Sequence, residues 1–367
     1  MGPIDMKILI PYDIKTTGMN NPYLFSLIRE LVKEDAVADV TVGYGWLYEE
    51  LKMDVIHLHW PELLVKSQLS DMSREDLLQS SHFEKVIGQL KKKKRDGSVI
   101  ITTIHNEKPH NDTKGVFSQF YSEIYSLSDG FIHMGTESEK LTKLQFEQET
   151  NEKMSFIIPH GNYSIFPSNL NRDECRKRLN ISPNQKVLLT FGAIRSEPEL
   201  NLGIDSFKKS NIDDSIYIMA GKLPFPYKSQ LNHFRVRKKL YRHHFSGKIR
   251  TVEKVISPEE VQVYLKSADL LFIPRYNTLN SGNVALGFTF GKVVVGPDYG
   301  VIGETLKLTG NPVFDPYHLH SVSEAIRSGL ESSQTDLTER NLNYAQNELN
   351  WKTVARKTIK AYQSLLV

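Results

Sequence analysis

Short runs of apolar residues alternate along the chain with longer segments in which apolar and polar positions are mixed. The short runs are rich in Val, Ile, Leu and aromatic residues, as β-strands are. The longer segments, such as 21–34 and 117–128, repeat their apolar residues at helical spacing. This alternation predicts parallel sheets whose strands are connected by helices.

The alternation runs through the sequence twice. In the first half the predicted strands are 7–12, 39–44, 55–60, 98–105, 130–135 and 154–160. The pattern begins again after 161–171 with a predicted helix at 172–180. The strands predicted in the second half are 186–194, 215–221, 251–256, 269–274, 292–296 and 311–315. We therefore expect an α/β protein of two doubly wound halves, joined near residues 160–170.

Length and composition agree with two cytoplasmic domains. A chain of 367 residues is long enough for two domains, each with its own core. Its net charge of +3 gives no whole-chain argument for nucleic acid. Cys175 is its one cysteine, which excludes an internal disulfide and suits a reducing compartment. The apolar runs are far shorter than the roughly 20 residues that cross a bilayer.

Histidines gather at the predicted strand ends of the first half. In doubly wound sheets, ligands bind beyond the carboxyl ends of the strands, so the residues there are the first candidates for a site. A metal site would need ligands at suitable spacing, but no two of these histidines stand four apart on a helix and no carboxylate cluster accompanies them. We expect a polar site without a metal. The histidines are His57, His59, His105 and His160, with His110 close behind.

The segment 278–296 reads TLNSGNVALGFTFGKVVVG and contains a helix-length stretch between two predicted strands. That helix begins with small polar residues and glycine: Ser281, Gly282 and Asn283. Ser and Asn cap helices by accepting hydrogen bonds from first-turn amides. The same bare amides, with the helix dipole, also form a seat for an anion such as a diphosphate. From this segment alone, both interpretations stay open.

The other strand ends of the second half carry cations next to glycines. Arg195, Lys222 and Arg275 each follow a predicted strand. Glycine allows a backbone to approach a ligand closely, and the cations could balance its charge. Together with the helix start at Ser281, these loops predict a diphosphate pocket in the second half.

The order of these motifs resembles that of the GT-B glycosyltransferases, above all the family 4-like bacterial enzymes that build exopolysaccharides. The first half carries the resemblance in NNPYLFSLIREL, VIHLHWPE, TIHNEKPH and IIPHGNY. The second half carries it in FGAIR, AGK and PEEVQVYLKSADLLFIPRYNTLNSGNVALGFTFGKVVVGPDYGVIGE. The resemblance implies two Rossmann-like domains facing a cleft. It places the acceptor-side domain at 1–165, the donor-binding domain at 166–350, and a last helix at 351–367 that crosses back to the first domain.

The resemblance also implies residue roles. The reaction would move a sugar from a UDP- or GDP-linked donor, which is a substrate, to a glycan or lipid-linked oligosaccharide, with no other cofactor and no metal. His105 would act next to the donor sugar. An inverting enzyme would add a base, for which Asp13, Glu62 and Glu107 are candidates that the sequence does not separate. The donor-binding residues would be Arg195, Lys222, Ser281, Gly282, Asn283 and Glu304. The acceptor-side residues would be Gly18, Asn21, Tyr23, His59, His110 and His160.

Three positions depart from the family pattern. Pro198 stands where the family usually has a lysine, and Thr278 and Leu286 stand where many members have two glutamates. A subgroup with SGN-like helix starts, some of whose members are labelled mannosyltransferases, is more similar to this chain. The departures leave open whether the anomeric configuration is retained. They also keep two alternatives: a non-catalytic relative that serves as a binding or partner subunit, and a non-hydrolysing sugar-nucleotide epimerase.

Two runs of basic residues are candidates for contact with a membrane or another partner. The run KKKKR lies at 91–95, and HFRVRKKLYRHH lies at 233–244. Each is either a solvated helix face or a surface that attracts anionic lipid headgroups. Aromatic residues among basic ones also occur in proteins that bind single-stranded nucleic acid, but no RNA-binding signature accompanies them, so we expect no nucleic-acid partner. A lipid-linked acceptor favours a cytoplasmic protein with peripheral contact at the inner face of the plasma membrane.

Overall fold

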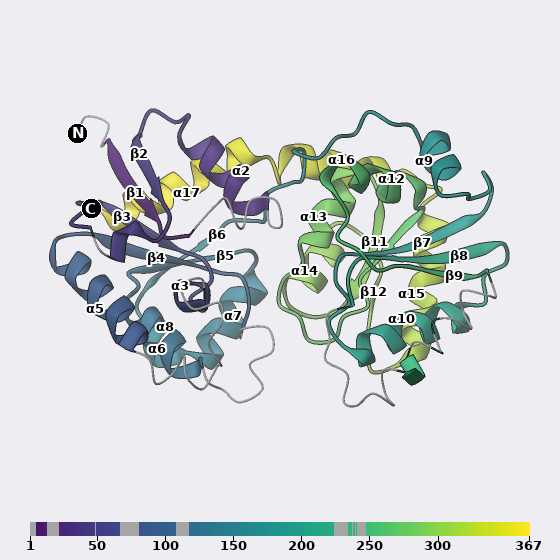
Figure 1. The fold of residues 1–367 in the computed structure, drawn as a ribbon, viewed down its shortest axis with the longest axis horizontal. Helices are drawn as coiled ribbons and strands as arrows, with labels where there is room; N and C mark the ends of the chain where they lie inside the picture. Colours follow the sequence, from purple (N-terminus) through teal and green to yellow (C-terminus); the bar gives the residue numbers. More distant parts are fainter. Residues whose placement is uncertain are drawn as a thin grey trace. The chain divides into compact units, whose positions relative to one another are not determined.

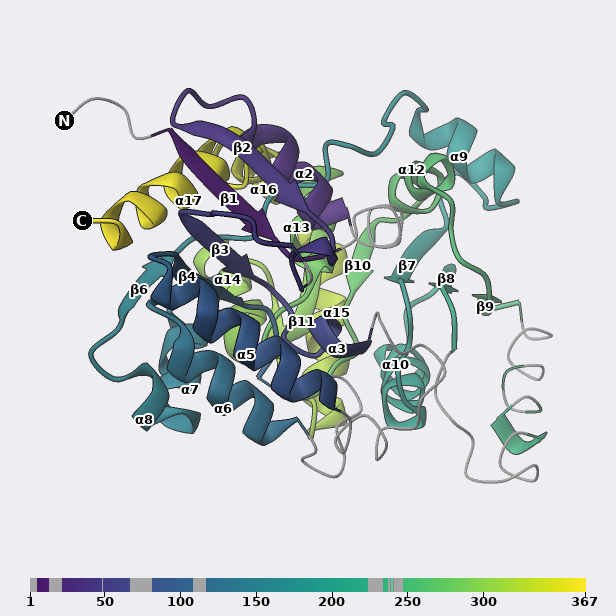
Figure 2. The same ribbon diagram turned by 60° about the vertical axis from the view of Figure 1, so that its left-hand side comes forward.

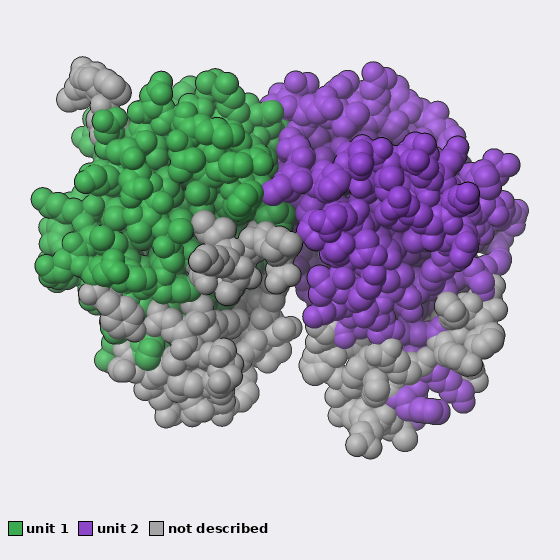
Figure 3. All heavy atoms as spheres, turned by 45° about the horizontal axis from the view of Figure 1, so that its top comes forward, with its two compact units in different colours: residues 1–161, 349–367 green, residues 162–348 purple. Residues whose placement is uncertain are grey.

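The computed structural model describes residues 5–12, 22–47, 49–66, 81–107, 117–223, 234–236, 238, 240 and 247–367 (Figure 1). The chain divides into two compact units (Figure 3). Unit 1 comprises Met1–Gly161 and Leu349–Val367, and unit 2 comprises Asn162–Glu348. The chain thus passes from unit 1 to unit 2 and returns.

Unit 1 is built on one parallel sheet. Its strands are β1 (Met6–Ile10), β2 (Val37–Val42), β3 (Val55–Leu58), β4 (Val99–Ile104), β5 (Gly130–His133) and β6 (Met154–Ile157). They lie in the order β2-β1-β3-β4-β5-β6, and every pair is parallel. All six coincide with strands predicted from the sequence. Because the chain runs from β1 outward to β2 and then returns to β3, the order reverses between β1 and β3.

Helices cover both faces of this sheet (Figures 1 and 2). One face carries α2 (Pro22–Leu31) and α17 (Trp351–Leu365), which pack against each other. The helical segments on the chain between β2 and β6 are η1 (Gly45–Leu47), α3 (Leu63–Lys66), α5 (Ser81–Arg95), α6 (Ser118–Leu127), α7 (Thr136–Gln145) and α8 (Glu147–Thr150). Of these, α5 and α6 lie against the other face of the sheet in Figure 1. Covering both faces lets β3 and β5 be buried along their whole length.

The end of the chain belongs to unit 1. The helix α16 (Leu337–Asn347) of unit 2 ends shortly before α17, whose first amides are capped by the Asn350 side chain. Trp351 is the first residue of α17. Its indole is buried against Gly161, where a Cβ would lie 2.3 Å from the ring, and against Tyr23 of α2. This contact fastens α17 to unit 1.

Unit 2 repeats the architecture with another strand order. Its strands are β7 (Lys186–Phe191), β8 (Ser215–Ala220), β9 (Ile249–Val252), β10 (Leu270–Phe272), β11 (Val293–Pro297) and β12 (Val313–Phe314). They are parallel and lie in the order β12-β11-β10-β7-β8-β9, so the order reverses between β7 and β10. The strand predicted at 251–256 is misplaced: pairing with β8 uses Ile249–Val252, and the exposed residues from 253 onward continue past the sheet.

The helices of unit 2 also cover two faces (Figure 2). On one face α10 (Glu197–Ser210) packs against α15 (Leu319–Ser332). The other helices of unit 2 include α9 (Arg172–Arg178), α12 (Pro258–Ser267), α13 (Gly282–Thr289), α14 (Gly300–Leu308) and α16. Within this second group α9 packs on α12, and α13 packs on α16. Their starts follow from local sequence, since α9 and α12 both begin with capping boxes.

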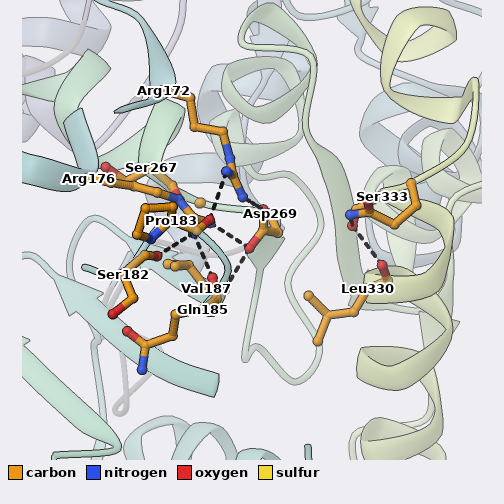
Figure 4. Close-up of polar contacts among 12 residues, drawn as sticks. Arg172, Arg176, Ser182, Pro183, Gln185, Val187, Ser267, Asp269, Leu330 and Ser333 are labelled. Atoms are coloured by element: carbon orange, nitrogen blue, oxygen red, sulfur yellow. Dashed lines mark hydrogen bonds and ion pairs between the residues drawn. The ribbon is translucent and has the colours of Figure 1, made fainter. Parts of the chain in front are cut away.

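Asp269 joins three elements at the amino-terminal edge of the unit 2 sheet (Figure 4). Its carboxylate accepts hydrogen bonds from Arg172 at 2.8 Å, from Arg176 at 2.8 Å and from the backbone N–H of Val187 at 2.8 Å. Arg176 is 1% exposed and also donates to the carbonyls of Ser182, Pro183 and Gln185. A buried charge is stable only when it is paired and hydrogen-bonded in this way. The network fixes α9 to the start of β7.

The predicted fold class is confirmed: the chain contains two doubly wound, Rossmann-like α/β domains. That they face each other stays a prediction. Among the described residues, no helix is both long enough and apolar enough to span a bilayer. In sheets of this kind the ligand site lies at the carboxyl ends of the strands where the strand order reverses. Each unit has one such point.

Candidate active site

The reversal point of unit 2 lies between β7 and β10, and an ion pair connects the loops that follow these strands. Arg275, after β10, donates to the carboxylate of Glu199 in α10 and, at 2.6 Å, to the carbonyl of Ala193 after β7. The backbone N–H of Arg195 donates to the same carboxylate at 2.8 Å. Arg275 and Glu199 are 7% and 8% exposed. Arg275 therefore holds the loop after β7 in place. The sequence suggested that Arg275 offers positive charge at the rim of the sheet, but in the structure this charge is paired with Glu199.

Arg195 lies half-buried on this loop. Burial, and next the neighbouring charge of Arg275, lower the pKa of its guanidinium to about 10. It stays cationic at neutral pH. A cation that is partly desolvated acts more strongly on a neighbouring anion than one in bulk water. The predicted role of Arg195 as a phosphate-binding cation stays a prediction.

The helix α13 begins at Gly282, and Ser281 is its N-cap, so the predicted helix start is confirmed. The Ser281 hydroxyl accepts a hydrogen bond from the N–H of Asn283 at 3.3 Å. The Asn283 side chain donates to the carbonyl of Phe191 at the end of β7, at 2.8 Å. This second contact fixes the first turn of α13 beside the loop that carries Arg195. Ser281 thus caps the helix, and a cap of this kind leaves other first-turn amides available to an anion.

Glycines allow the strand ends of unit 2 to approach each other. Gly192 and Gly221, which follow β7 and β8, have φ angles of +89° and +155°. A Cβ on Gly221 would lie 1.9 Å from the carbonyl oxygen of Gly192. Gly300, at the start of α14, has φ +54°, and its Cβ would lie 2.7 Å from the carbonyl oxygen of Leu279. At Gly221 and Gly300 a Cβ would clash with backbone atoms, whereas at Gly192 only the positive φ favours glycine.

The remaining positions of the predicted donor site differ in their surroundings. Lys222 is exposed, and its carbonyl accepts from Ile194, which ties the loop after β8 to the loop after β7. Glu304 is half-buried in α14. Leu286, at the place of a family glutamate, is 3% exposed and packs in the core, so it has no polar group to offer a sugar. Pro198 is exposed in the first turn of α10, where proline is well tolerated.

The reversal point of unit 1 lies between β1 and β3, and a tyrosine hydroxyl joins them. Tyr12, two residues after β1, is fully buried. Its hydroxyl oxygen accepts from the backbone N–H groups of His59 and Trp60, at 2.9 and 3.0 Å. This contact sets the direction in which the chain leaves β3. The predicted residues Asp13, Gly18 and Asn21 lie on the segment that follows Tyr12, which is outside the described residues. The predicted residue His110 is also outside the described residues.

Four of the predicted histidines of unit 1 form one cluster with aromatic residues. His57 lies 2.7 Å from the Tyr362 hydroxyl through Nδ1 and 2.7 Å from the Thr103 hydroxyl through Nε2. The rings of His57 and His59 have their centroids 4.1 Å apart. Nδ1 of His59 lies 3.0 Å from Nε2 of His105. Nδ1 of His160, the fourth, lies 2.6 Å from the carbonyl of Gly161.

Burial keeps these rings neutral. Desolvation lowers the pKa of His57 to about 3 and that of His160 to about 4. The same cause holds the pKa values of His59 and His105 well below the ordinary value of 6.5, and each is lowered further by neighbouring histidines. At neutral pH these imidazoles can donate or accept hydrogen bonds, but they carry no charge. His59 is 1% exposed, so its ring contacts its neighbours rather than solvent.

The other predicted residues of unit 1 lie around this cluster. Tyr23, at the start of α2, is 4% exposed and has its ring edge against His105 and His160. Glu62 is 5% exposed and accepts a hydrogen bond of 2.5 Å from the Tyr121 hydroxyl. Glu107 is half-buried. The choice among the candidate bases stays open. Within the described part of the chain, no three His, Cys, Asp or Glu side chains are grouped as metal ligands would be.

Sequence reasoning missed Glu199, Tyr12 and Trp60. Glu199 follows Ser196 at the spacing of a capping box, which predicts a local role at the helix start. The Ser196 side chain does cap α10, but the Glu199 carboxylate bonds Arg275 and the N–H of Arg195. Tyr12 and Trp60 look like ordinary core residues in the sequence. Their position next to strand ends is the signal that could have found them.

The basic run at 91–95 contributes to the structure of unit 1. Lys92 pairs with Glu50 at 2.8 Å, and Lys94 pairs with Asp129 at 2.6 Å. Lys93 is buried and donates to the carbonyl of Leu51 at 2.6 Å. Three of the five basic side chains are thus engaged within the domain, which reduces the charge available to a lipid surface. The run at 233–244 lies largely outside the described residues.

Comparisons with known proteins identify the fold. No protein-family model matches the chain. No curated protein sequence matches it either. Among solved structures, a sucrose-phosphate synthase from Thermosynechococcus elongatus is similar with a TM-score of 0.67 and 15% identity, covering 98% of both chains. Anabaena HepE in complex with UDP-glucose has a TM-score of 0.68 and 12% identity, covering 98% of this chain and 100% of its own. A glycosyltransferase from Rickettsia africae has a TM-score of 0.67 and 14% identity, covering 99% of both chains.

Proposed function

We propose that this protein is a glycosyltransferase that moves a sugar from a nucleoside-diphosphate donor to a glycan or lipid-linked oligosaccharide in bacterial surface polysaccharide synthesis. One observation carries the proposal: at the reversal point of unit 2, the capped start of α13 is bonded to the end of β7, directly before the loop that carries Arg195. The fold shared with sucrose-phosphate synthase and with the UDP-glucose complex of HepE supports it.

The chemistry follows from the charge of the leaving group. When the bond between sugar and diphosphate breaks, negative charge grows on the diphosphate. Fixed amides at the start of α13 and the guanidinium of Arg195 would stabilise that charge without a metal, and removal of one such donor commonly slows a reaction about a hundredfold or more. His105, neutral and buried in unit 1, would hydrogen-bond the donor sugar. UDP or GDP would be the nucleotide, and Lys222 and Glu304 would complete the donor site.

Binding of the nucleotide tests the donor site directly. We expect UDP or GDP to bind the wild-type protein in calorimetry, and Arg195→Ala and Gly282→Val to weaken that binding. The Arg195→Ala effect should be smaller for the nucleoside without phosphates. The control is Lys186→Ala, because Lys186 is exposed at the opposite end of β7 and its loss should leave the affinity unchanged. Unchanged affinity in both test variants would reduce the start of α13 to a helix cap.

A second candidate is a non-catalytic subunit that keeps the donor site for binding. It is favoured by Leu286, an apolar and buried residue that stands where many members of the family have a glutamate. Slow release of free sugar from UDP- or GDP-sugars, without any acceptor, would support the enzyme. Nucleotide binding without turnover, with or without acceptor glycans, would support the subunit.

A membrane-linked acceptor needs contact between the protein and a lipid surface. Lys92, Lys93 and Lys94 are engaged within unit 1, so this contact is tested separately. Co-sedimentation with vesicles of anionic phospholipid tests it. The protein should sediment with anionic vesicles at low salt and not with neutral ones. Equal behaviour with both would favour a water-soluble glycan acceptor.

A further inference from the structure

The contact between His59 and His105 bears on how His105 can meet a substrate. The two residues follow neighbouring strands, His59 after β3 and His105 after β4. Nδ1 of His59 and Nε2 of His105 lie 3.0 Å apart, which is a hydrogen bond in which one ring donates and the other accepts. The Tyr12 hydroxyl holds the backbone of His59 in place. The position of Nε2 in His105 is thereby tied to an anchored neighbour.

Two aromatic rings restrain His105 in the other directions. The Trp60 ring stacks on it with centroids 4.1 Å apart and an interplanar angle of 23°. The Tyr23 ring meets it edge to face at 5.0 Å. Stacking restricts tilting of the imidazole, but it leaves the ring free to turn within its own plane. The hydrogen bond with His59 restricts that rotation.

The surroundings of Nε2 in His59 indicate which of the two rings donates the hydrogen bond. Its Nε2 is buried and, among the described residues, has no hydrogen-bond partner. Both rings are neutral, so each carries a single proton. A buried N–H without a partner is rarer in proteins than a buried acceptor without one. The proton of His59 therefore belongs on Nδ1, where it donates to Nε2 of His105, and the proton of His105 is left on Nδ1.

We propose that His59 is a positioning residue that holds His105 in the tautomer protonated at Nδ1. The inference rests on the proposed function in one respect, since that function places His105 beside the donor sugar. A hydrogen-bond donor there suits a sugar hydroxyl oxygen. It also separates His105 from the candidate bases, because a ring whose Nε2 already accepts from His59 has no vacant lone pair for a substrate proton.

The tautomer can be measured without any enzymatic assay. In a long-range proton–nitrogen NMR spectrum of the full chain labelled with ¹⁵N-histidine, His105 should show a protonated Nδ1 and an unprotonated Nε2 at pH 7.5. Its signals are identified by their loss in His105→Gln. His59→Asn keeps a polar atom near the place of Nδ1 and should preserve the pattern, whereas His59→Leu should lose it. A wild-type His105 protonated at Nε2, or a pattern unchanged in His59→Leu, would overturn the proposal.

His133 supplies the matched control. It is another buried histidine of unit 1, and its Nδ1 lies 3.2 Å from the Ser138 hydroxyl. Its hydrogen bond and ring contact within the described residues are with Ser138 and Phe131 and do not involve His105. His133→Leu removes a ring of the same burial and should leave the His105 signals unchanged. A change equal to that in His59→Leu would mean that the His105 pattern responds to general loss of packing, which contradicts a specific role of His59.

Kinetics then distinguish positioning from stability. His59→Leu should lower kcat roughly tenfold to a hundredfold, as loss of a partner that orients an imidazole does elsewhere, with nucleotide affinity unchanged. In the His105→Ala background the same change should have no further effect. An equal decrease in both backgrounds would show that His59 is merely structural. If the wild type has no turnover at all, the proposed function fails, but the NMR result still decides the tautomer.

Discussion

The two units have the same kind of parallel sheet, yet their reversal points are built from opposite chemistry. In unit 2 the strand ends are held by a buried ion pair, Arg275 with Glu199, and by glycines that bring backbones together. In unit 1 they are held by neutral rings and hydroxyls, with Tyr12 bridging β1 and β3. Under the proposed function, unit 2 would offer the charge of Arg195 and the first amides of α13 to an anion, and unit 1 would offer hydrogen bonds to a neutral group. The topology fixes where a ligand meets each sheet, and the side chains decide which ligand it is.

The largest expected difference between the two units is the loss of stability of unit 1 at acid pH. Buried histidines of unit 1 stay neutral in the fold, but in the unfolded chain they take up protons below about pH 6.5. Because their pKa values are lowered in the fold, unfolding takes up protons, and the stability of unit 1 is lost as pH falls from 6.5 to about 4. The loss is on the order of 1 kcal/mol per histidine and pH unit. The histidines whose pKa values are lowered in the fold are His57, His59, His105, His133 and His160.

Tryptophan fluorescence measures this loss in unit 1 alone, because all three tryptophans lie there. The control is a double change in unit 2, His318→Asn with His320→Asn, since both side chains are exposed. It should not move the acid midpoint. A fluorescence signal that stays constant down to pH 4 would show that the histidine cluster does not limit the stability of unit 1.

Breaking the ion pair of unit 2 should have the next largest effect. Glu199→Ala leaves Arg275 buried without its carboxylate partner, and such changes cost about 3–5 kcal/mol. Glu199→Gln keeps an acceptor and should cost less. Denaturant unfolding followed by circular dichroism measures the difference. Lys254→Ala, which breaks an exposed pair with Glu260 in the same unit, should cost far less, because water screens an exposed pair. Equal costs for Glu199→Ala and Lys254→Ala would contradict the distinction between buried and exposed pairs.

Two glycines of unit 2 allow a finer comparison. Gly221→Ala and Gly192→Ala both place a Cβ at positive φ, which costs about 1 kcal/mol. At Gly221 the Cβ also meets the carbonyl of Gly192, whereas nothing lies within 4 Å of the Cβ at Gly192. Gly221→Ala should therefore be more destabilising, by about 1–2 kcal/mol beyond the cost at Gly192. Similar unfolding midpoints for the two variants would mean that the two strand ends can move apart freely.

The smallest effect is expected away from both reversal points. Lys92→Ala removes the exposed partner of Glu50 in unit 1 and should barely change the free energy of unfolding, because water screens an exposed pair. Thermal unfolding at low and high salt checks this, because salt screens exposed pairs and should reduce the difference further. A larger effect that salt does not change would show that the basic run stabilises α5 by something other than this ion pair.

The sequence predicted the local parts of this structure well. The strands of unit 1 and the start of α13 follow from periodicity and capping, which depend on neighbours a few residues away. The strand predicted at 251–256 was wrong because its true extent is set by pairing with β8, not by its own apolar residues. The sequence suggested that Arg275 could offer positive charge at the rim of the sheet, because it did not reveal the partner Glu199, which lies 76 positions earlier.

The sequence by itself determined the fold class, the two domains of alternating strands and helices, and the candidate residues at the strand ends. Only the tertiary structure decided which of these residues meet. Nδ1 of His59 and Nε2 of His105 come within 3.0 Å although the residues are 46 positions apart, because β3 and β4 are neighbours in the sheet. The physical reason is range: hydrogen-bonded turns and apolar periodicity act along the chain, whereas burial, ring stacking and ion pairing act across space between segments that the sequence does not order.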